Sequence, residues 1–277
     1  MDALAEYHGV DASQVFVGVG SDDVLAMSFL TFFNSDKPIL FPDITYSFYD
    51  VWAELFRLKI DDYKGENGGI VFPNPNAPTG IYESLDHVEE IIKNNPDVIV
   101  IVDEAYIDFG GETALPLIDK YDNLVVVRTF SKSRSMAGLR IGYAISNPEL
   151  IKALNDVKYS YNSYTMNRPS LVLGVESIHD DAYFWEKVGQ IIATRERFVK
   201  EIAELGFTCL PSSANFVFAT HESIPAKEIF AAAKENNIYV RYFDKPRIDN
   251  YLRISIGTDA EMDVFVSFLS KYVKEYK

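Results

Sequence analysis

The sequence contains a single cysteine, Cys209, among 277 residues. One thiol cannot form a disulfide within the chain, which excludes a disulfide-stapled scaffold and favours a reducing compartment. No run of 18 or more apolar residues occurs, so no transmembrane helix is predicted. The N-terminus, MDALAEYHGV, lacks the basic and apolar regions of a signal peptide and resembles the last turns of an amphipathic helix. We therefore expect a cytoplasmic protein without a membrane partner.

Cations are also scarce. The chain has 26 Lys and Arg against 41 Asp and Glu, a formal net charge of −15, which disfavours nucleic acid or an anionic membrane as the main partner. The exception is Asn123–Pro148, which contains no acid and carries Arg128, Lys132, Arg134 and Arg140. We call this segment the cation island, and it predicts a site for a small anion. The histidines show no metal-ligand spacing, so no metal site is predicted.

The first part of the chain predicts an α/β fold. Short runs rich in Val and Ile, such as VIVIV, are typical of strands covered on both faces, and they alternate with helical periodicity. We expect a mainly parallel, doubly wound sheet sandwiched by helices. The predicted strands are Val15–Val19, Ile39–Phe41, Gly69–Phe72, Val98–Val102, Leu124–Arg128 and Ile141–Ile145, and the helices between them are Asp22–Phe33, Ser47–Phe56 and Ser84–Asn94.

After about Asn147 the pattern changes to one dominated by helices and then by short strands. We expect residues 1–157 to form a large domain, and residues 158–277 to supply interdomain helices and a smaller α+β domain. No Pro-, Gly- or Ser-rich linker separates them, which predicts a broad interface with a cleft. The later elements expected are a helix around Ala182–Leu205, strands Phe216–Ala219, Tyr239–Tyr242 and Leu252–Ile256, and helices Ala226–Glu235 and Ala260–Tyr276.

In open α/β sheets, ligands bind beyond the carboxyl ends of the strands. Gly20-Ser21-Asp22 follows the first predicted strand. It can cap a helix and offer free N–H groups to an anion, although an ordinary helix start is the commoner explanation. A dinucleotide fingerprint is weakened because Asp23 replaces its third glycine. The third strand is followed by PNPNAPTG, residues 73–80, whose three prolines indicate a rigid ligand wall rather than a simple turn.

Two further strand ends carry charged side chains. Asp103 follows a buried strand, where a carboxylate is costly unless it meets a cation or strong donor, or caps the next element. Lys132 follows the next strand. A lysine among cations loses its proton more readily, and a neutral amine attacks aldehydes. Ser131 and Arg140 can hold a phosphate beside it. A phosphate clamp, a Schiff-base lysine and a carboxylate for a pyridinium nitrogen together predict pyridoxal 5′-phosphate (PLP).

Seven segments in order resemble the fold-type I PLP enzymes of aminotransferase class I/II, and among them the histidinol-phosphate aminotransferase family. They are GSDD, PNPNAPTG, VDEAYIDF, TFSKSRSMAGLRIGY, SSANFVF, VRYF and YLRISIGT. The resemblance covers almost the whole chain. It implies a PLP-dependent aminotransferase of histidine biosynthesis that uses histidinol phosphate and 2-oxoglutarate. Three alternatives stay open: an aminotransferase for another amino acid, a lyase like the threonine-phosphate decarboxylases, and a PLP-binding homologue with little activity.

The resemblance also implies roles for individual residues. Lys132 would bind PLP as a Schiff base and shuttle the proton, Asp103 would pair with the pyridine nitrogen, and Tyr106 would hydrogen-bond the phenolic oxygen. Tyr46 would stack on the ring. The residues implied at the cofactor phosphate are Ser21, Asp22, Thr129, Ser131 and Arg140. The residues implied at the substrate are Arg241 and Arg253, at the substrate's phosphate end, and Asn215, which would line the site.

Two departures from the family pattern matter. The family has asparagine before Pro-Thr-Gly, where this chain has Ala77, so either Asn76 reaches the phenolic oxygen of PLP or Tyr106 acts alone. The family also has some tens of residues before LAEYHGV, including a segment over the active site and a tyrosine that reaches the neighbouring subunit's cofactor. The resemblance implies a homodimer with the site at the subunit interface, and we expect substrate closure and kcat to depend most on that segment.

Overall fold

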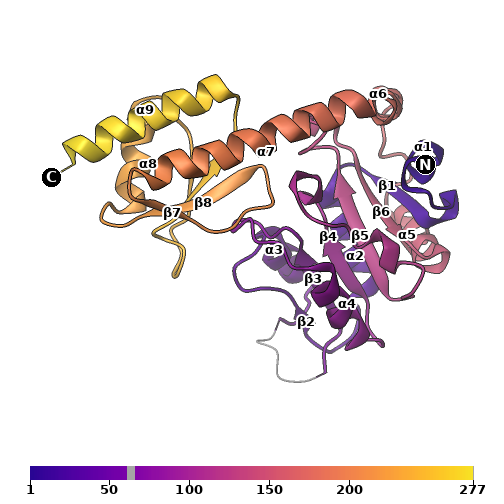
Figure 1. The fold of residues 1–277 in the computed structure, drawn as a ribbon. Coiled ribbons are helices and arrows are strands. Elements are labelled where there is room, and N and C mark those ends of the chain that lie inside the picture. Colours follow the sequence, from indigo (N-terminus) through magenta and orange to yellow (C-terminus); the bar gives the residue numbers. More distant parts are fainter. Residues whose placement is uncertain (61–65, 277) are drawn as a thin grey trace.

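The computed structural model describes residues 1–60 and 66–276, and two β-sheets organise it. The larger sheet has six strands with helices around it, and the smaller has four. The long helix α7 (Asp181–Ala203) runs from one sheet to the other (Figure 1). The α/β class predicted from the sequence is confirmed, as is a second, smaller α+β unit at the C-terminal end.

The large sheet is mainly parallel. Its strands, in spatial order, are β1 (Val15–Gly18), β6 (Gly142–Ser146), β5 (Leu124–Thr129), β4 (Val100–Asp103), β3 (Gly69–Pro73) and β2 (Ile39–Leu40). Strands β2 to β5 are parallel, whereas β6 is antiparallel to both of its neighbours. The connection from β5 to β6, residues 130–141, contains no α-helix. A parallel crossover usually needs one, so this short connection returns the chain in the opposite direction.

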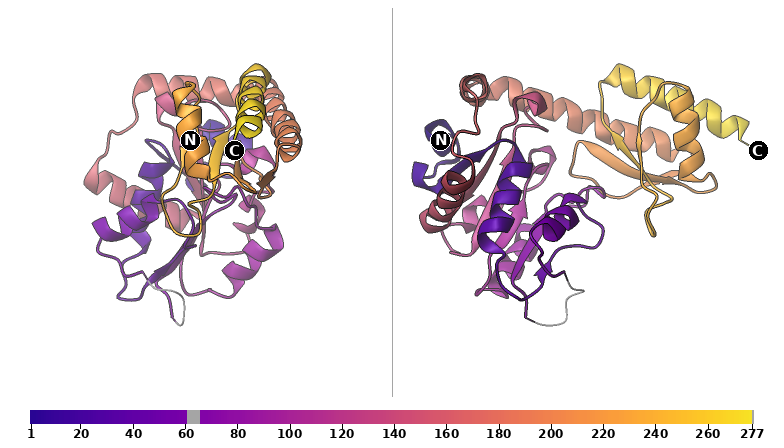
Figure 2. Two further views of the ribbon diagram at one scale, coloured as in Figure 1. Left: turned by 90° about the vertical axis from the view of Figure 1, so that its left-hand side faces the viewer. Right: turned by 180° about the vertical axis from the view of Figure 1, so that it is seen from behind.

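Helices cover both faces of the large sheet, as Figure 2 shows from the side and from behind. One face packs against α2 (Ser21–Phe32), α3 (Phe48–Leu55) and α5 (Pro148–Tyr161). The other packs against α1 (Asp2–His8), α4 (Leu85–Lys93) and α6 (Arg168–His179). Strand β5 serves both cores, because Val125 and Val127 point to the first and Leu124 and Val126 to the second. Sandwiching by helices is thus confirmed.

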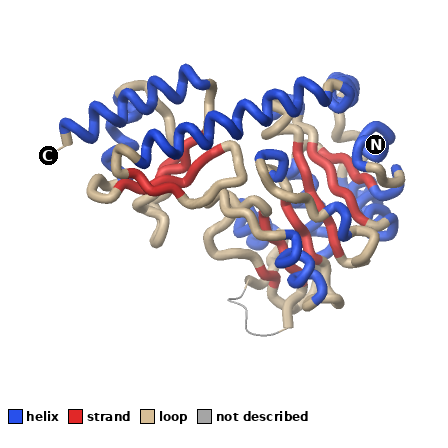
Figure 3. The backbone as a smooth tube through the Cα atoms, in the orientation of Figure 1, coloured by secondary structure: helices blue, strands red, loops and turns tan. Residues whose placement is uncertain are grey.

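The small sheet is antiparallel, in the order β7 (Phe207–Cys209), β8 (Phe216–His221), β10 (Leu252–Ser255), β9 (Arg241–Tyr242). Figure 3 shows helices along it, namely the end of α7, α8 (Ala226–Glu235) and α9 (Asp259–Glu275). These helices and Val217 of β8 share one apolar core. Phe216, the preceding residue, points to the opposite face and packs with Tyr106 and Ala77 of the large domain. The small sheet therefore faces the strand ends of the large one.

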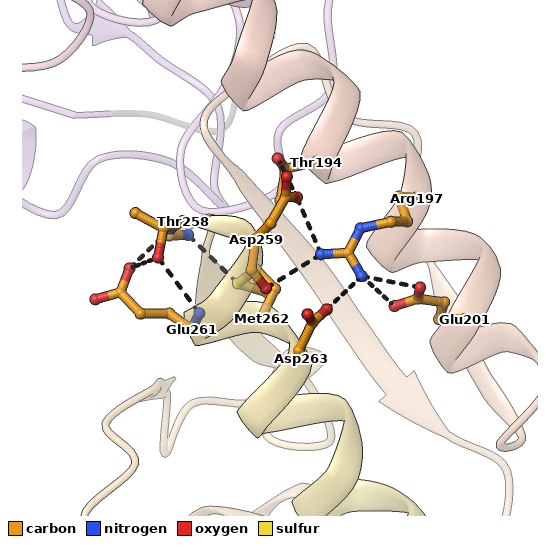
Figure 4. A network of polar contacts seen from close by, with 9 residues as sticks. Thr194, Arg197, Glu201, Thr258, Asp259, Glu261, Met262 and Asp263 are labelled. Atoms are coloured by element: carbon orange, nitrogen blue, oxygen red, sulfur yellow. Dashed lines mark hydrogen bonds and ion pairs between the residues drawn. The ribbon is translucent and has the colours of Figure 1, made fainter.

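Helix α7 connects the two domains. Its first half contributes Phe184 to the cluster between them, and its second half contributes Phe198 to the small-domain core. Arg197 then fixes α7 to α9 by pairing with Asp259 and Asp263, as Figure 4 shows. The division expected between residues 157 and 158 falls inside α5, which packs on the large sheet. We propose α7 as the connection between the domains.

The predicted elements differ from the observed ones by at most two residues at either end, and β7 is the strand that was not predicted. The 3-10 helices of the structure are η1 (Ala12–Gln14), η2 (Ile107–Phe109), η3 (Leu115–Leu117) and η4 (Ala137–Leu139). In the part of the chain that is described, none of the helices has the length and apolar character needed to cross a membrane.

Candidate active site

The strand ends that carry polar side chains meet at one edge of the large sheet. In the parallel register, Pro73 at the end of β3 lies beside Asp103 at the end of β4, which in turn lies beside Val127 of β5. The PNPNAPTG loop begins at the last residue of β3, and Lys132 is the third residue after β5. The sheet thus brings the predicted loop, carboxylate and lysine together.

Asp103 is a buried carboxylate, with an exposed fraction of 4%. Its Oδ2 accepts a hydrogen bond from the Tyr49 hydroxyl at 3.0 Å, and its Oδ1 accepts one from the Ala105 N–H at 3.1 Å. Burial raises its pKa from 3.8 to about 6, while these hydrogen bonds and the charge of Lys132 act in the opposite direction. Among the described residues no cation forms an ion pair with Asp103. A buried carboxylate with donors and no cation suits a ligand that brings positive charge.

Lys132 lies beside the aromatic ring of Tyr106. Its Nζ is 5.3 Å from the centroid of the Tyr106 ring, and no carboxylate of the described residues forms an ion pair with it. Tyr106 is buried and packs edge-on against Phe216 of the small domain, with ring centroids 5.1 Å apart. Phe216 in turn lies under the guanidinium of Arg253 at 5.1 Å. Lys132 and Arg253 are thus connected through the edge-to-face pair of the Tyr106 and Phe216 rings.

The other cations of the island have acidic partners from elsewhere in the chain. Arg128 is buried and pairs with Asp108. Arg134 lies 4.1 Å above the Phe184 ring and 3.9 Å from Asp181. The segment itself contains no acidic residue, but the folded chain places acidic residues from other segments beside it. The expectation that the whole island serves a small anion is wrong for Arg128 and Arg134, whose partners neutralise them.

Arg140 lies at the start of α2, where an anion was expected. Gly20 is the N-cap, with φ of 89°, and no side chain caps the helix, so capping by Ser21 or Asp22 is not observed. A Cβ on Gly20 would lie 2.5 Å from Nη2 of Arg140, so glycine makes room for the guanidinium. Asp22 pairs with Arg140 at 3.6 Å and accepts a hydrogen bond from the Tyr46 hydroxyl at 2.9 Å.

Thr129 is the last residue of β5, and Ser131 lies on the turn that follows. The Ser131 N–H donates to Thr129 Oγ1 at 3.1 Å, which folds the chain back before Lys132. Tyr46 approaches from the segment before α3, and burial together with the Asp22 carboxylate raises the pKa of its phenol. The structure thus brings Asp22, Tyr46 and Arg140 into one cluster.

Asn76 holds loops together. Its Nδ2 donates to the Ile44 carbonyl at 3.0 Å and to Thr79 Oγ1 at 2.7 Å, and its Oδ1 accepts from Thr45 at 3.1 Å. Both amide hydrogens are therefore engaged. The role of Asn76 as a cofactor ligand remains a prediction. To donate a hydrogen bond to PLP, Asn76 would have to give up one of these two bonds. Ala77 is buried against Tyr106.

A cavity of about 560 Å³ opens between the two domains. Tyr46 and Ala77 line it from the large domain, and Arg241 and Arg253 line it from the small one. The two arginines are directly paired residues of β9 and β10. Nε of Arg253 is buried without a hydrogen-bond partner, so the fold holds a donor ready at this wall. Asn215 is half-buried next to Phe216, beside the same cluster.

The family model for aminotransferase class I and II matches residues 1–269. The chain belongs to this family. It is 50% identical to a histidinol-phosphate aminotransferase of Lactococcus lactis subsp. cremoris, over 98% of this chain and 80% of that protein. Among solved structures, it superposes on the histidinol-phosphate aminotransferase of Sinorhizobium meliloti in complex with PLP, with a TM-score of 0.89 and 22% identity. That superposition covers 100% of this chain and 81% of the other. The enzyme of Clostridium acetobutylicum has the same TM-score, at 22% identity over 99% and 87% of the chains.

Aminotransferases of this class use PLP, and the residues present fit it. PLP carries a phosphate, an aldehyde and a ring nitrogen that is positively charged when protonated. Arg140 at the start of α2 suits the phosphate, and Lys132 suits the aldehyde. Asp103 is the buried carboxylate that lacks a cation among the described residues. When bound, PLP supplies a ring that withdraws electrons from the substrate's Cα.

Three residues of this aminotransferase that lie at the site were not predicted from the sequence: Tyr49, Lys245 and Arg247. Tyr49 of α3 donates to Asp103, whereas the predicted residue Tyr46 lies before the start of that helix. Lys245 and Arg247 line the cavity from the loop between β9 and β10. That loop lacks periodicity, so nothing local indicates which of its side chains face the cavity.

Proposed function

We propose that this aminotransferase transfers the amino group of histidinol phosphate to 2-oxoglutarate. The observation that carries the proposal is the arrangement of Asp103 and Lys132 at adjacent strand ends, together with Arg241 and Arg253 on the small-domain wall of the cavity. The first pair suits PLP, and the second suits a phosphorylated donor. The 50% identity to a histidinol-phosphate aminotransferase over 98% of the chain supports the same substrate.

Lys132 would take the proton from Cα of the amino donor and pass it on to the cofactor, so that the amino group stays with the cofactor, and it would move a proton in the reverse direction for the oxo acid. Asp103 keeps the ring nitrogen protonated, because a cation relieves the cost of burying this carboxylate. Tyr49 holds Asp103 in place through the hydrogen bond of 3.0 Å. Tyr106 lies beside Lys132 and would donate to the phenolic oxygen of PLP, and Tyr46, which lines the cavity, would cover the ring.

The cofactor phosphate is assigned to the turn after β5 and the start of α2. The groups that bind it are the N–H groups of Ser21 and Asp22, with Thr129, Ser131 and Arg140. The N-terminus of α2 carries the partial positive charge of the helix dipole. Arg140 would then exchange its contact with Asp22 for the phosphate, while Asp22 would keep the hydrogen bond from Tyr46.

The donor occupies the cavity between the domains. Arg241 and Arg253 bind its phosphate, since guanidinium groups match phosphate oxygens in geometry and charge. Asn215, next to Phe216, would line the site. The family's other substrate is an oxo acid, and the same arginines take its distal carboxylate in the return half-reaction.

The absorption spectrum of the purified protein tests this proposal. With PLP, we expect a visible band that histidinol phosphate bleaches and 2-oxoglutarate restores, and that is missing in Lys132→Ala. A band that histidinol phosphate leaves unchanged would contradict the proposed substrate. Release of carbon dioxide in place of glutamate would instead identify a decarboxylase.

We also propose that the protein is a cytoplasmic homodimer. Exposed apolar side chains on α6 support association, because a row of them is costly to leave in water. They are Leu171, Val172, Leu173 and Val175. Sedimentation analysis tests the assembly, and a monomer at micromolar concentration would contradict it.

A further inference from the structure

Positive charge concentrates on the substrate cavity in an otherwise acidic chain. The cavity is lined by Arg241, Lys245, Arg247 and Arg253, against the single carboxylate of Asp43. The net charge of the protein is −15, so this excess is local. Anions that enter between the domains therefore meet a positively charged surface, which includes Lys245 and Arg247 in addition to the arginine pair assigned above.

The arginines differ in how they are held. Arg253 lies 5.1 Å from the Phe216 ring centroid, and Arg241 lies 5.5 Å from that of Phe243. Aromatic support fixes both guanidinium planes. Arg247 instead donates a hydrogen bond across the cavity mouth to Asp43, which lies in the large-domain segment that also carries Tyr46. Arg247 is therefore the arginine whose contact can be exchanged.

The ion pair between Arg247 and Asp43 is a weak one. The two side chains are 68% and 67% exposed, and exposed pairs contribute little net free energy because water competes for both partners. A phosphate dianion in the cavity attracts Arg247 more strongly than a single carboxylate does. The pair therefore leaves Arg247 available to an incoming phosphate.

The backbone holds Arg247 at this place. Its φ is 72°, in the left-handed region that side chains rarely adopt. The next residue, Ile248, is buried and donates its N–H to the Lys245 carbonyl at 3.2 Å, which closes the turn. A residue kept in an unfavourable conformation by its anchored neighbours is a sign of function.

We propose that Arg247 is a specificity-determining ligand for the phosphate of the amino donor, and that Asp43 holds it until the donor binds. This inference rests on the proposed function, because it requires a phosphorylated donor. On binding, Arg247 leaves Asp43 and joins Arg241 and Arg253 around the phosphate. A ligand must therefore attract Arg247 more strongly than Asp43 does, which favours a phosphate dianion over a neutral group or a single carboxylate.

The test compares histidinol phosphate with histidinol as donors for the PLP-loaded enzyme. Arg247→Ala should lower kcat/KM for histidinol phosphate about 10- to 100-fold, mainly through KM, and that for histidinol by much less. Arg247→Lys should lie between, since it keeps the charge and loses the bidentate fork. Asp43→Asn should lower KM for histidinol phosphate up to about fivefold, because it removes the competitor. Asp249→Asn removes an exposed charge from the same loop and is the matched control.

Each outcome decides between distinct explanations. Equal losses for both donors in Arg247→Ala and in Asp43→Asn would show that the pair only ties the domains together, and would overturn the inference. A wild type that prefers histidinol phosphate, with the preference intact in Arg247→Ala, would overturn it as well. A wild type without that preference would overturn the proposed substrate itself.

Discussion

Replacing Asp103 with asparagine should change the pH dependence of stability in the cofactor-free protein. Burial raises the pKa of this carboxyl from 3.8 to about 6. The unfolded chain releases the proton near the ordinary value, and the folded chain retains it to higher pH. The wild type therefore loses stability as the pH rises from about 4 to 6 and levels off above that range. Asparagine does not titrate, so the variant lacks this loss.

The magnitude follows from the linkage between proton binding and folding. The full difference in pKa corresponds to about 3 kcal/mol, since each pKa unit is worth about 1.4 kcal/mol. About half of this loss of stability occurs above pH 5. We therefore expect the free energy of unfolding of Asp103→Asn, relative to the wild type, to rise by about 1.4 kcal/mol from pH 5 to pH 8. The amide's own burial cost shifts this difference equally at every pH.

Urea unfolding of both proteins without PLP, at several pH values, measures this change. Exposed Asp249→Asn controls for the loss of one negative charge. A difference between variant and wild type that stays constant from pH 5 to pH 8 would refute the reasoning, because it would show that Asp103 titrates alike in the folded and unfolded chains. Adding PLP should stabilise the wild type more than the variant, since the ring nitrogen provides the missing cation.

Four further substitutions test other parts of the account. Lys132→Ala should reduce turnover by about 10³-fold or more with the fold intact by circular dichroism, and full activity would contradict its role. Tyr49→Phe should lower the free energy of unfolding at pH 8 by about 1–3 kcal/mol, because Asp103 loses a donor, and unchanged urea curves would contradict this. Arg241→Ala should weaken the preference for phosphorylated over unphosphorylated donor about tenfold or more, measured by kcat/KM, and an unchanged preference would contradict it. Arg197→Ala should cost about 1 kcal/mol by thermal unfolding and leave kcat unchanged, so a lower kcat would contradict its purely structural role.

Much of the fold follows from local pattern. The Val-rich runs of β4 and β5 predicted strands buried on both faces, and the structure buries both strands completely. Other features depend on tertiary contacts. The reversed direction of β6 follows from its short connection to β5, and β7, with only three residues, offers too little periodicity to recognise. The end of the large domain could not be located from composition, because α5 and α7 are both long amphipathic helices.

The site residues could be predicted where a charged side chain lies at or just after the end of a strand, as for Asp103 and Lys132. It was not predictable where partners come from distant segments. Arg128 has an acid-free neighbourhood in the sequence, yet its partner Asp108 comes from the turn after β4. The partner of Arg247 could likewise not be predicted, because Asp43 is 204 residues away in the sequence and meets Arg247 only in the folded chain. Pairings of this kind are set by the folded chain and leave no local signal.

The most direct test of the central claim is to follow the amino nitrogen itself. The PLP-loaded protein is incubated with histidinol phosphate labelled with ¹⁵N in its amino group, together with 2-oxoglutarate, and glutamate is analysed by mass spectrometry. We expect ¹⁵N-glutamate from the wild type and none from Lys132→Ala. Unlabelled glutamate only, or equal labelling by both proteins, would contradict the claim that this protein uses Lys132 to transfer the amino group of histidinol phosphate.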